Sequence, residues 1–289
     1  RHAVHERQPR WTNFPRKKHM ILGIDVGGTH TDSVLMQNRK IIRKSKVLTD
    51  KNDILGCVMR ATQAVATPDD IKQLHRIVLS TTISTNAVAQ NQLDPVGLIV
   101  MNGPGVSPKD LPLADKTSLI AGYMNHRGIE AEALDDDELA ALKQKFSKDK
   151  IDNLAVIGKF STRNPVHEQE VGAYFDGQAS HVSLGHHQSG VLNFPRRIAT
   201  TYLNSAIWRL HSRMVDQLAS YLQGLGVDVP LFILKADGGT IGVEQSRKYP
   251  VQTILSGPAA TIMGVLPFVS STADSVSIDV GGTCLLYTS

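Results

Sequence analysis

Short apolar runs alternate with stretches of helical periodicity along the whole chain. Runs of roughly four to eight apolar residues are typical of buried strands, whereas apolar residues spaced three and four apart are typical of helices. The first pattern predicts strands at residues 20–26, 31–36, 40–49, 75–81, 96–101, 153–160, 181–186, 229–236 and 275–280.

The helical pattern occurs in three stretches, at residues 53–66, 135–146 and 196–223. In the third stretch the apolar residues recur about every 3.6 residues, which is one turn of an α-helix. Three successive strands followed by alternating helices and strands predict a mixed α/β sheet with covering helices. Residues 102–130 contain several glycines and prolines, and they predict a long loop or insertion.

Length and composition are those of an ordinary globular protein. The chain has 289 residues, of which 41% are hydrophobic and 20% charged, and this is enough for two packed lobes or one large α/β domain. No apolar run approaches the roughly 18 residues that a membrane span needs. Two cysteines cannot form a disulfide framework. A reducing cytoplasm and no membrane attachment are therefore expected.

The net charge of +4 is concentrated at the start of the chain. Residues 1–19 contain six arginines or lysines and one glutamate, a net of +5, so the rest of the chain sums to −1. A nucleic-acid binder would carry basic residues over a folded face, and no nucleic-acid partner is expected here. Residues 1–19 also lack the apolar core of a secretory signal. They are interpreted as a disordered leader or as mistranslated upstream sequence.

The hexapeptide IDVGGT occurs twice, at residues 24–29 and 278–283. In the first copy Gly27 and Gly28 interrupt a strand whose alternation resumes at Thr31, and this predicts a hairpin. A single copy is equally well explained as an ordinary turn. Two copies, each on an apolar strand, favour two phosphate-binding hairpins that face each other across a cleft between two lobes.

The residue types at the hairpin tip suit a bound phosphate. Glycine reaches positive φ without strain, so successive backbone N–H groups can turn toward one anion. The hydroxyl groups of Thr29 and Thr31 add further donors. The carboxylate of Asp25 is instead expected to hold a hydrated Mg²⁺ ion beside the phosphates. The chain contains no P-loop motif and no glycine-rich dinucleotide motif that follows a strand and opens a helix.

Six segments of the chain, in a fixed order, resemble one known family. The six segments are GIDVGGTHTDSVLM (23–36), STTISTNAVAQ (80–90), STRNPVHEQEVG (161–172), PRRIATTYLNSAI (195–207), TILSGPAAT (253–261) and SIDVGGT (277–283). Through them the chain is similar to the hydantoinase A/5-oxoprolinase family of the actin-like ATPase superfamily over roughly residues 20–283.

The resemblance implies an α/β fold: an actin-like ATPase (ribonuclease H-like) lobe with a mixed sheet and covering helices, and a second lobe that is only begun. It implies a hydantoinase/oxoprolinase N-terminal domain at residues 20–190 and the truncated start of a hydantoinase A ATPase domain at residues 191–283. Residues 284–289 do not continue the second hexapeptide as the family does, and they are interpreted as a non-native tail. The chain is therefore expected to be the N-terminal part of a longer enzyme and to hydrolyse ATP weakly or not at all by itself.

The implied chemistry is ATP-dependent activation of a small cyclic amide or carbonyl compound, such as a hydantoin or 5-oxoproline, by phosphoryl transfer for ring opening. The implied cofactors are ATP and Mg²⁺, and the implied partner is a hydantoinase B-type subunit or domain. A sugar kinase of the same superfamily and a non-catalytic nucleotide switch are the alternatives.

The resemblance also implies site residues. Asp25 and Asp279 are expected to be catalytic and to hold Mg²⁺ through water. The expected phosphate-binding residues are Gly27, Gly28, Thr29 and Thr31 in the first hairpin, and Gly281, Gly282 and Thr283 in the second. The candidates for cleft or substrate contacts are Asp32, Thr81, Thr82, Thr85, Asn86 and Arg197.

The chain departs from the family at Leu79 and Ser80, where a histidine and a glycine are usual. This difference predicts another substrate or an altered site. The segments Gly238–Gly239 and Ser256–Pro258 are expected to be structural turns rather than catalytic elements.

Overall fold

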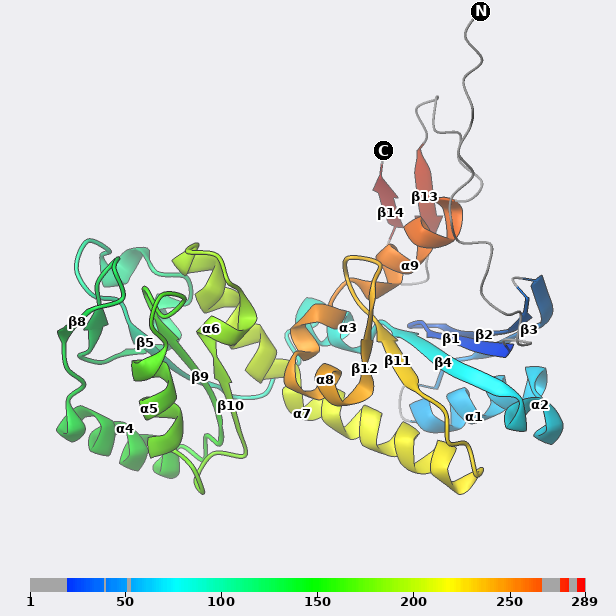
Figure 1. Cartoon of the computed structure of the whole chain (residues 1–289), viewed down its shortest axis with the longest axis horizontal. Coiled ribbons are helices and arrows are strands. Elements are labelled where there is room, and N and C mark those ends of the chain that lie inside the picture. Colours follow the sequence, from blue (N-terminus) through cyan, green and yellow to red (C-terminus); the bar gives the residue numbers. More distant parts are fainter. Residues whose placement is uncertain (1–19, 39, 51–52, 267–275, 281–284, 289) are drawn as a thin grey trace, which may run out of the picture.

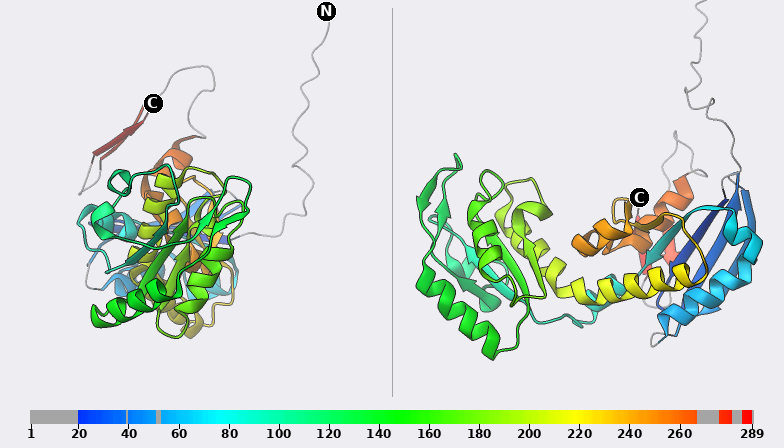
Figure 2. Two further views of the ribbon diagram at one scale, coloured as in Figure 1. Left: turned by 90° about the vertical axis from the view of Figure 1, so that its left-hand side faces the viewer. Right: turned by 60° about the horizontal axis from the view of Figure 1, so that its bottom comes forward.

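A computed structural model of the chain describes residues 20–38, 40–50, 53–266, 276–280 and 285–288. Figures 1 and 2 show two bodies that lie side by side, each built on its own sheet. The predicted leader at residues 1–19 lies outside the described residues.

The first body contains a six-stranded mixed sheet with the order β12-β11-β4-β1-β2-β3. Strands β1, β4 and β11 are parallel to one another, and β2, β3 and β12 are antiparallel to their neighbours. The carboxyl ends of the three parallel strands therefore meet at one edge of the sheet. The strand bounds are β1 Met20–Val26, β2 His30–Gln37, β3 Lys40–Leu48, β4 Leu74–Thr81, β11 Leu231–Leu234 and β12 Thr240–Gly242.

Alternation of buried and less buried residues gives this sheet two different faces. In β1 the side chains of Leu22, Ile24 and Val26 are buried in a core with α1 (Ile54–Val65) and the second half of α7 (Phe194–Gly224). Because side chains alternate along a strand, the residues between them point to the opposite face. The short helix α2 (Pro68–Lys72) follows α1 and begins with a capping box at Thr67.

The second body contains a parallel four-stranded sheet with the order β10-β9-β5-β6. Its central strands are wholly buried, as expected for a parallel sheet with both faces covered. One face packs against α4 (Asp136–Lys148) and α5 (Val166–Tyr174), and the other packs against the first half of α7. The strand bounds are β5 Gly97–Met101, β6 Thr117–Leu119, β9 Asn153–Gly158 and β10 His181–Leu184.

Helix α7 belongs to the cores of both bodies. It has 31 residues, which corresponds to a length of about 46 Å. Ile198 and Tyr202 pack with the four-stranded sheet, whereas Val215 and Leu218 pack with the six-stranded sheet. The helix therefore fixes the two bodies to one continuous element, and Figure 1 shows it running from the side of the second body to beneath the first.

The remaining elements are short. The helices are α3 (Ile83–Ala89), α6 (Gly185–Gln188), α8 (Val243–Lys248) and α9 (Ser256–Val265). Three 3₁₀ turns cover Pro108–Asp110, Ala114–Lys116 and Pro250–Thr253. Two small two-stranded sheets pair β7 (Tyr123–Met124) with β8 (Glu130–Glu132) and β13 (Ser277–Val280) with β14 (Leu285–Thr288).

Every strand and helix predicted from periodicity is present, with differences at the ends. Of the two alternatives predicted for residues 102–130, an unbroken long loop is wrong, because two 3₁₀ turns and the strands β6 and β7 lie there. These strands have only two or three residues, too few for a periodic pattern. The predicted domain boundary at residues 190 and 191 stays a prediction. No helix among the described residues is long and apolar enough to cross a membrane.

The buried histidine of α7 gives a prediction about pH. His211 is fully buried, and its ring lies 3.1 Å from the Ser246 hydroxyl of α8. Burial and the nearby Arg247 guanidinium lower the pKa of His211 from 6.5 to about 4. The unfolded chain therefore binds a proton at this site below about pH 6.5, where the folded chain does not. The free energy of unfolding should fall as the pH decreases from about 6.5 to about 4.

His211→Gln removes the titrating ring and should flatten this pH dependence, as measured by urea unfolding between about pH 7 and pH 4.5. The exposed His126 provides the control, and His126→Gln should keep the parent slope. Equal slopes for the parent and His211→Gln would contradict the assignment.

Candidate functional site

The edge at which the parallel strands β1, β4 and β11 end carries the residues predicted to bind phosphate. Ligands of open α/β sheets bind outside the carboxyl ends of parallel strands. Four turns meet near this edge: residues 26–30 between β1 and β2, 81–85 between β4 and α3, 235–240 between β11 and β12, and 253–257 before α9.

The β1–β2 hairpin is closed by a tight backbone contact. The N–H of Gly27 donates to the carbonyl oxygen of His30 at 2.9 Å, and a Cβ at Gly27 would lie 2.8 Å from the same oxygen. Neither Gly27 nor Gly28 is among the described glycines with positive φ. Gly27 is therefore required for close approach and not for its dihedral angles, and its N–H is already used within the hairpin.

The two threonines of the hairpin differ in their surroundings. Thr29 is exposed at the tip. Thr31 is fully buried, and its hydroxyl oxygen lies 2.9 Å from that of Thr49. Thr29 is therefore accessible to a ligand, whereas the Thr31 side chain fixes the start of β2 against the segment after β3.

A row of polar side chains crosses the sheet beside the hairpin. Asp25 on β1 is in register with Asp32 on β2 and with Ser80 on β4, and Asp32 is in register with Lys46 on β3. The Lys46 ammonium donates to both oxygens of Asp32, at 2.9 and 2.7 Å. Residues in register point to the same face. The row therefore brings two carboxylates and one ammonium to a single face.

This donor set fits a magnesium ion. Mg²⁺ takes oxygen ligands, keeps several of its waters and is held in proteins by one or two carboxylates together with substrate phosphates. Asp25 is half-buried at the end of β1, directly opposite Asp32. The described residues contain no cluster of three or more metal-ligating side chains. A metal at this edge would therefore be held mainly through water and a phosphate group.

The turn after β4 ties α3 to the end of β1. The backbone N–H and the hydroxyl of Thr82 donate to the carbonyl oxygen of Val26, at 3.1 and 3.3 Å. Asn86 donates to the Thr82 hydroxyl at 3.2 Å. The buried Thr81 hydroxyl accepts the N–H of Ile83 at 3.2 Å. These polar side chains hold the edge together.

The start of α9 is bonded to the same turn. The hydroxyl of Thr85 accepts the N–H of Leu255 at 2.8 Å. The hydroxyl of the buried Ser256 donates to the carbonyl oxygen of Thr81 at 3.2 Å. The N-terminus of α9 therefore lies next to the end of β4.

The structure brings most of the predicted site residues of the first body to one edge. Asp279 lies on β13, and its side chain is not among the described features. Gly281, Gly282 and Thr283 lie outside the described residues. The residues that meet at the edge are Asp25, Gly27, Gly28, Thr29, Thr31, Asp32, Thr81, Thr82, Thr85 and Asn86.

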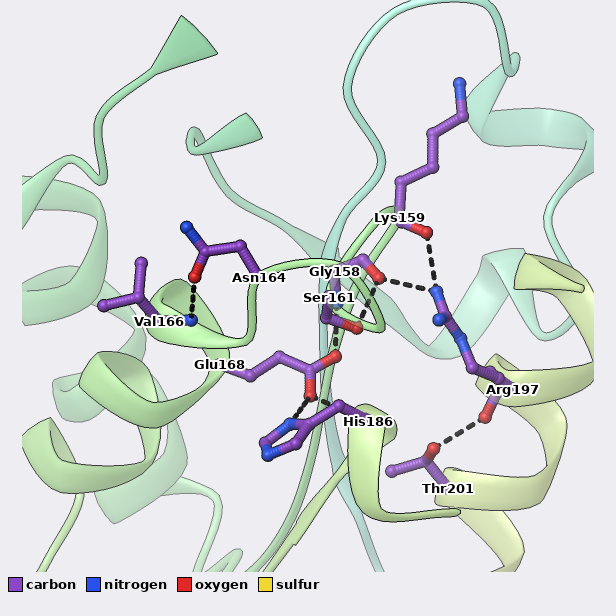
Figure 3. A network of polar contacts seen from close by, with 9 residues as sticks. All are labelled: Gly158, Lys159, Ser161, Asn164, Val166, Glu168, His186, Arg197 and Thr201. Carbon is purple, nitrogen blue, oxygen red and sulfur yellow. Dashed lines mark hydrogen bonds and ion pairs between the residues drawn. The ribbon is translucent and has the colours of Figure 1, made fainter. Parts of the chain in front are cut away.

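Arg197 is not part of this edge. It lies at the start of α7 in the second body, is 1% exposed, and donates to the carbonyl oxygens of Gly158 and Lys159 at 2.8 and 2.6 Å (Figure 3). Burial lowers the pKa of its guanidinium, and the charge of Glu168 acts in the opposite direction. In this structure Arg197 fixes the turn after β9.

Glu168 completes this buried network, and sequence reasoning missed it. The carboxylate is fully buried and accepts the N–H of Gly158 at 2.8 Å, the N–H of His186 at 2.8 Å and the Nδ1 atom of His186 at 2.5 Å (Figure 3). A sequence signal existed, because Glu168 lies three residues before Val171 and seven before Phe175, both fully buried. This spacing places Glu168 on the buried face of α5.

A small hollow adjoins the Glu168 network. It lies at the carboxyl ends of β5 and β9, far along the chain from the β1–β2 hairpin. Its lining includes Met101, Met124, Ser161, Asn164, His167 and Glu168. The Glu168 oxygens and the Ser161 hydroxyl in this hollow already bond to protein groups.

Comparison with known proteins gives matches along most of the chain. The family model described as hydantoinase/oxoprolinase N-terminal region matches residues 21–176, and the model described as hydantoinase/oxoprolinase matches residues 197–285. The caprolactamase subunit alpha of Pseudomonas jessenii is 24% identical over an alignment 300 residues long, and the alignment covers 92% of this chain and 43% of that protein. The chain thus spans less than half the length of this relative.

Two solved structures have a similar fold. A nucleotide-free acetone carboxylase superposes with a TM-score of 0.76 at 19% identity, covering 87% of this chain and 41% of that chain. The ATP-dependent caprolactamase of Pseudomonas jessenii superposes with a TM-score of 0.72 at 23% identity, covering 91% of this chain and 42% of that chain.

The close approach at Gly27 predicts that Gly27→Ala damages the hairpin. The added Cβ would lie 2.8 Å from a backbone oxygen, so the backbone must shift. A loss of about 1–3 kcal/mol in the free energy of unfolding is expected in urea. Gly190→Ala is the control, because a Cβ there meets no atom within 4 Å. Equal stability of the two variants would show that the hairpin tolerates a side chain at this position.

The three hydrogen bonds that the Glu168 carboxylate accepts predict that a neutral side chain of the same shape destabilises the fold. Glu168→Gln replaces one acceptor oxygen by an NH₂ group, which leaves a buried donor without an acceptor. The free energy of unfolding should fall by about 1–3 kcal/mol. The exposed Glu170 on the same helix is the matched control, and Glu170→Gln should change it by less than about 0.5 kcal/mol. Similar values for both variants would argue against the network.

Proposed function

The chain belongs to the hydantoinase/oxoprolinase family, and we propose that it carries one phosphate-binding lobe of an ATP-dependent cyclic amide hydrolase. The fold class predicted from the sequence, an α/β lobe of the actin-like ATPase type, is confirmed by the likeness to the acetone carboxylase and caprolactamase structures. The family resemblance inferred from the six motifs is confirmed as well.

The observation that supports this function best is the geometry of the β1–β4 edge. A hairpin with an exposed Thr29 lies directly beside the Asp25–Asp32 pair, at the carboxyl ends of parallel strands. A polyphosphate with its magnesium ion needs hydrogen-bond donors for its oxygens and carboxylates for the metal waters. This edge offers both. In the proposal, Asp25 orients water on Mg²⁺, and Gly28 and Thr29 contact phosphate oxygens.

ATP would supply the phosphoryl group. In the proposed reaction the amide oxygen of the substrate forms a bond to the γ-phosphorus while the bond to the ADP oxygen breaks. Water then adds to the activated carbon, and the ring C–N bond breaks as a proton passes to the ring nitrogen, which leaves an acyl phosphate. A second water hydrolyses the acyl phosphate to the carboxylate and inorganic phosphate. The contribution of this chain is to position the phosphates and to balance their charge.

The cyclic amide class rests on the curated relative, which is named as one subunit of a caprolactamase. That name also supports a further subunit for the complete enzyme. We propose that this subunit is of the hydantoinase B type. In this proposal Asp279, Gly281, Gly282 and Thr283 also bind the nucleotide phosphates, as the identity of residues 278–283 with residues 24–29 suggests.

Asp25→Asn tests the metal role. The change keeps the shape of the side chain and removes its charge, so Mg²⁺-dependent ATP affinity should fall on the order of tenfold or more. Isothermal titration of the chain with ATP, with and without Mg²⁺, measures this effect. Asp136→Asn, at an exposed position of α4, is the control. An unchanged magnesium dependence in Asp25→Asn would contradict the assignment.

The catalytic proposal is tested on the complete enzyme, assembled with its partner subunit. Steady ADP release that requires a cyclic amide supports the proposal. ATP binding without turnover in the presence of hydantoins, lactams or 5-oxoproline would instead indicate a nucleotide switch.

A further inference from the structure

The first turn of α9 has an unusual start. Leu255, its N-cap residue, has φ 65° and ψ 23°, a left-handed conformation that leucine rarely adopts, and no side chain caps the helix. Backbone strain of this kind is often retained at sites that bind a ligand. The conformation also turns successive N–H groups toward one point, as in the backbone nests that bind anions.

Two N–H groups of this turn are available. The N–H of Leu255 is used by the Thr85 hydroxyl, and the N–H of Ala259 donates to the Leu255 carbonyl oxygen at 3.3 Å. The N–H groups of Ser256 and Gly257 have no acceptor within the described part of the chain. Both lie at the positive end of a ten-residue helix, where a negative group is stabilised.

An independent observation comes from Ser80. Its side chain is 6% exposed, and its hydroxyl oxygen has no hydrogen-bond partner among the described residues. The preceding Leu79 is buried in the core with α1 and α7, so Ser80 points to the opposite face of the sheet. Helix α9 begins over that face, and its Ser256 hydroxyl bonds to the residue after Ser80 (Figure 1).

A buried hydroxyl without a partner is costly, and its persistence at this place points to a ligand oxygen. Ser80 is also in register with Asp25. A negative ligand group beside Asp25 would be repelled unless a cation lies between them. The ligand that fits all these groups is an oxyanion that binds together with a hydrated divalent cation.

We propose that Ser80 and the N-terminus of α9 bind a phosphoryl oxyanion from the side opposite the β1–β2 hairpin. This inference deepens the proposed function and rests on it. It changes the expectation that Ser256–Pro258 form a purely structural turn. It also gives the departure at Ser80 a role, because a hydroxyl placed there donates to the ligand where the usual family glycine has no side chain.

The test follows the amide signals of Ser256 and Gly257 by NMR as inorganic phosphate is added to the chain, with and without Mg²⁺. Sodium chloride at equal ionic strength is the control for screening. A saturable shift of both signals that is stronger with Mg²⁺ is expected. Ser80→Ala should weaken the apparent phosphate affinity about tenfold, because it removes a hydrogen bond to a charged group.

Thr62→Val is the matched control variant. Thr62 is 1% exposed on α1, beneath the other face of the sheet, and its hydroxyl also has no partner among the described residues. Both variants remove a buried, unpartnered hydroxyl, so neither should lower the melting temperature. Thr62→Val should keep the parent affinity for phosphate.

The outcomes are distinct. No saturable shift at Ser256 and Gly257, or equal affinities for the parent and Ser80→Ala, would overturn the inference. If ATP shifts the Gly28 and Thr29 amide signals in the same sample, the proposed nucleotide-binding function still holds even though the inferred anion site is rejected. If ATP with Mg²⁺ shifts neither region while phosphate shifts Ser256 and Gly257, the anion site stands and the nucleotide proposal fails.

Discussion

The parallel pairing of β1 with β4 is the constraint on which the candidate site depends. It aligns Asp25 with Ser80, although 54 residues separate them in the sequence. A parallel neighbour requires a crossover connection, and α1 provides it while covering the apolar face. The opposite face is thereby left for polar side chains. The same pairing directs the turn after β4 onto the end of β1, where Thr82 bonds to Val26.

Helix α7 imposes a second constraint, because one rigid element lies in two cores. Arg209, near its middle, also donates to both carboxylate oxygens of Asp152 at 2.7 Å and thus ties the helix to the segment that leads into β9. Arg197 lies nearer the start of the helix, inside the second body. Arg197 therefore does not contact the β1–β4 edge in this arrangement. It could affect that edge only indirectly, through α7.

The sequence predicted what depends on local pattern and missed what depends on register. β1 and α7 were predictable because their apolar periods extend over whole elements. The row of polar side chains was not predictable, because the local sequence pattern does not determine the strand register that places Lys46 opposite Asp32. The role of Gly27 was assigned to positive φ, whereas the structure shows close contact with the His30 carbonyl oxygen. The helical spacing places Glu168 on the buried face of α5, but its three donors come from Gly158 of β9 and His186 of α6, which the local pattern does not specify.

The charges and donors at the edge limit how an anion can bind there. Gly27 uses its N–H within the hairpin and Thr31 is buried, so fewer hairpin donors are available than the motif suggests. Asp25 and Asp32 add two negative charges against one from Lys46. A phosphate group at this edge therefore gains most from a divalent cation on the carboxylate side and from N–H donors on the other side. Metal dependence thus follows from the charge balance of the edge, as well as from the chemistry of the nucleotide.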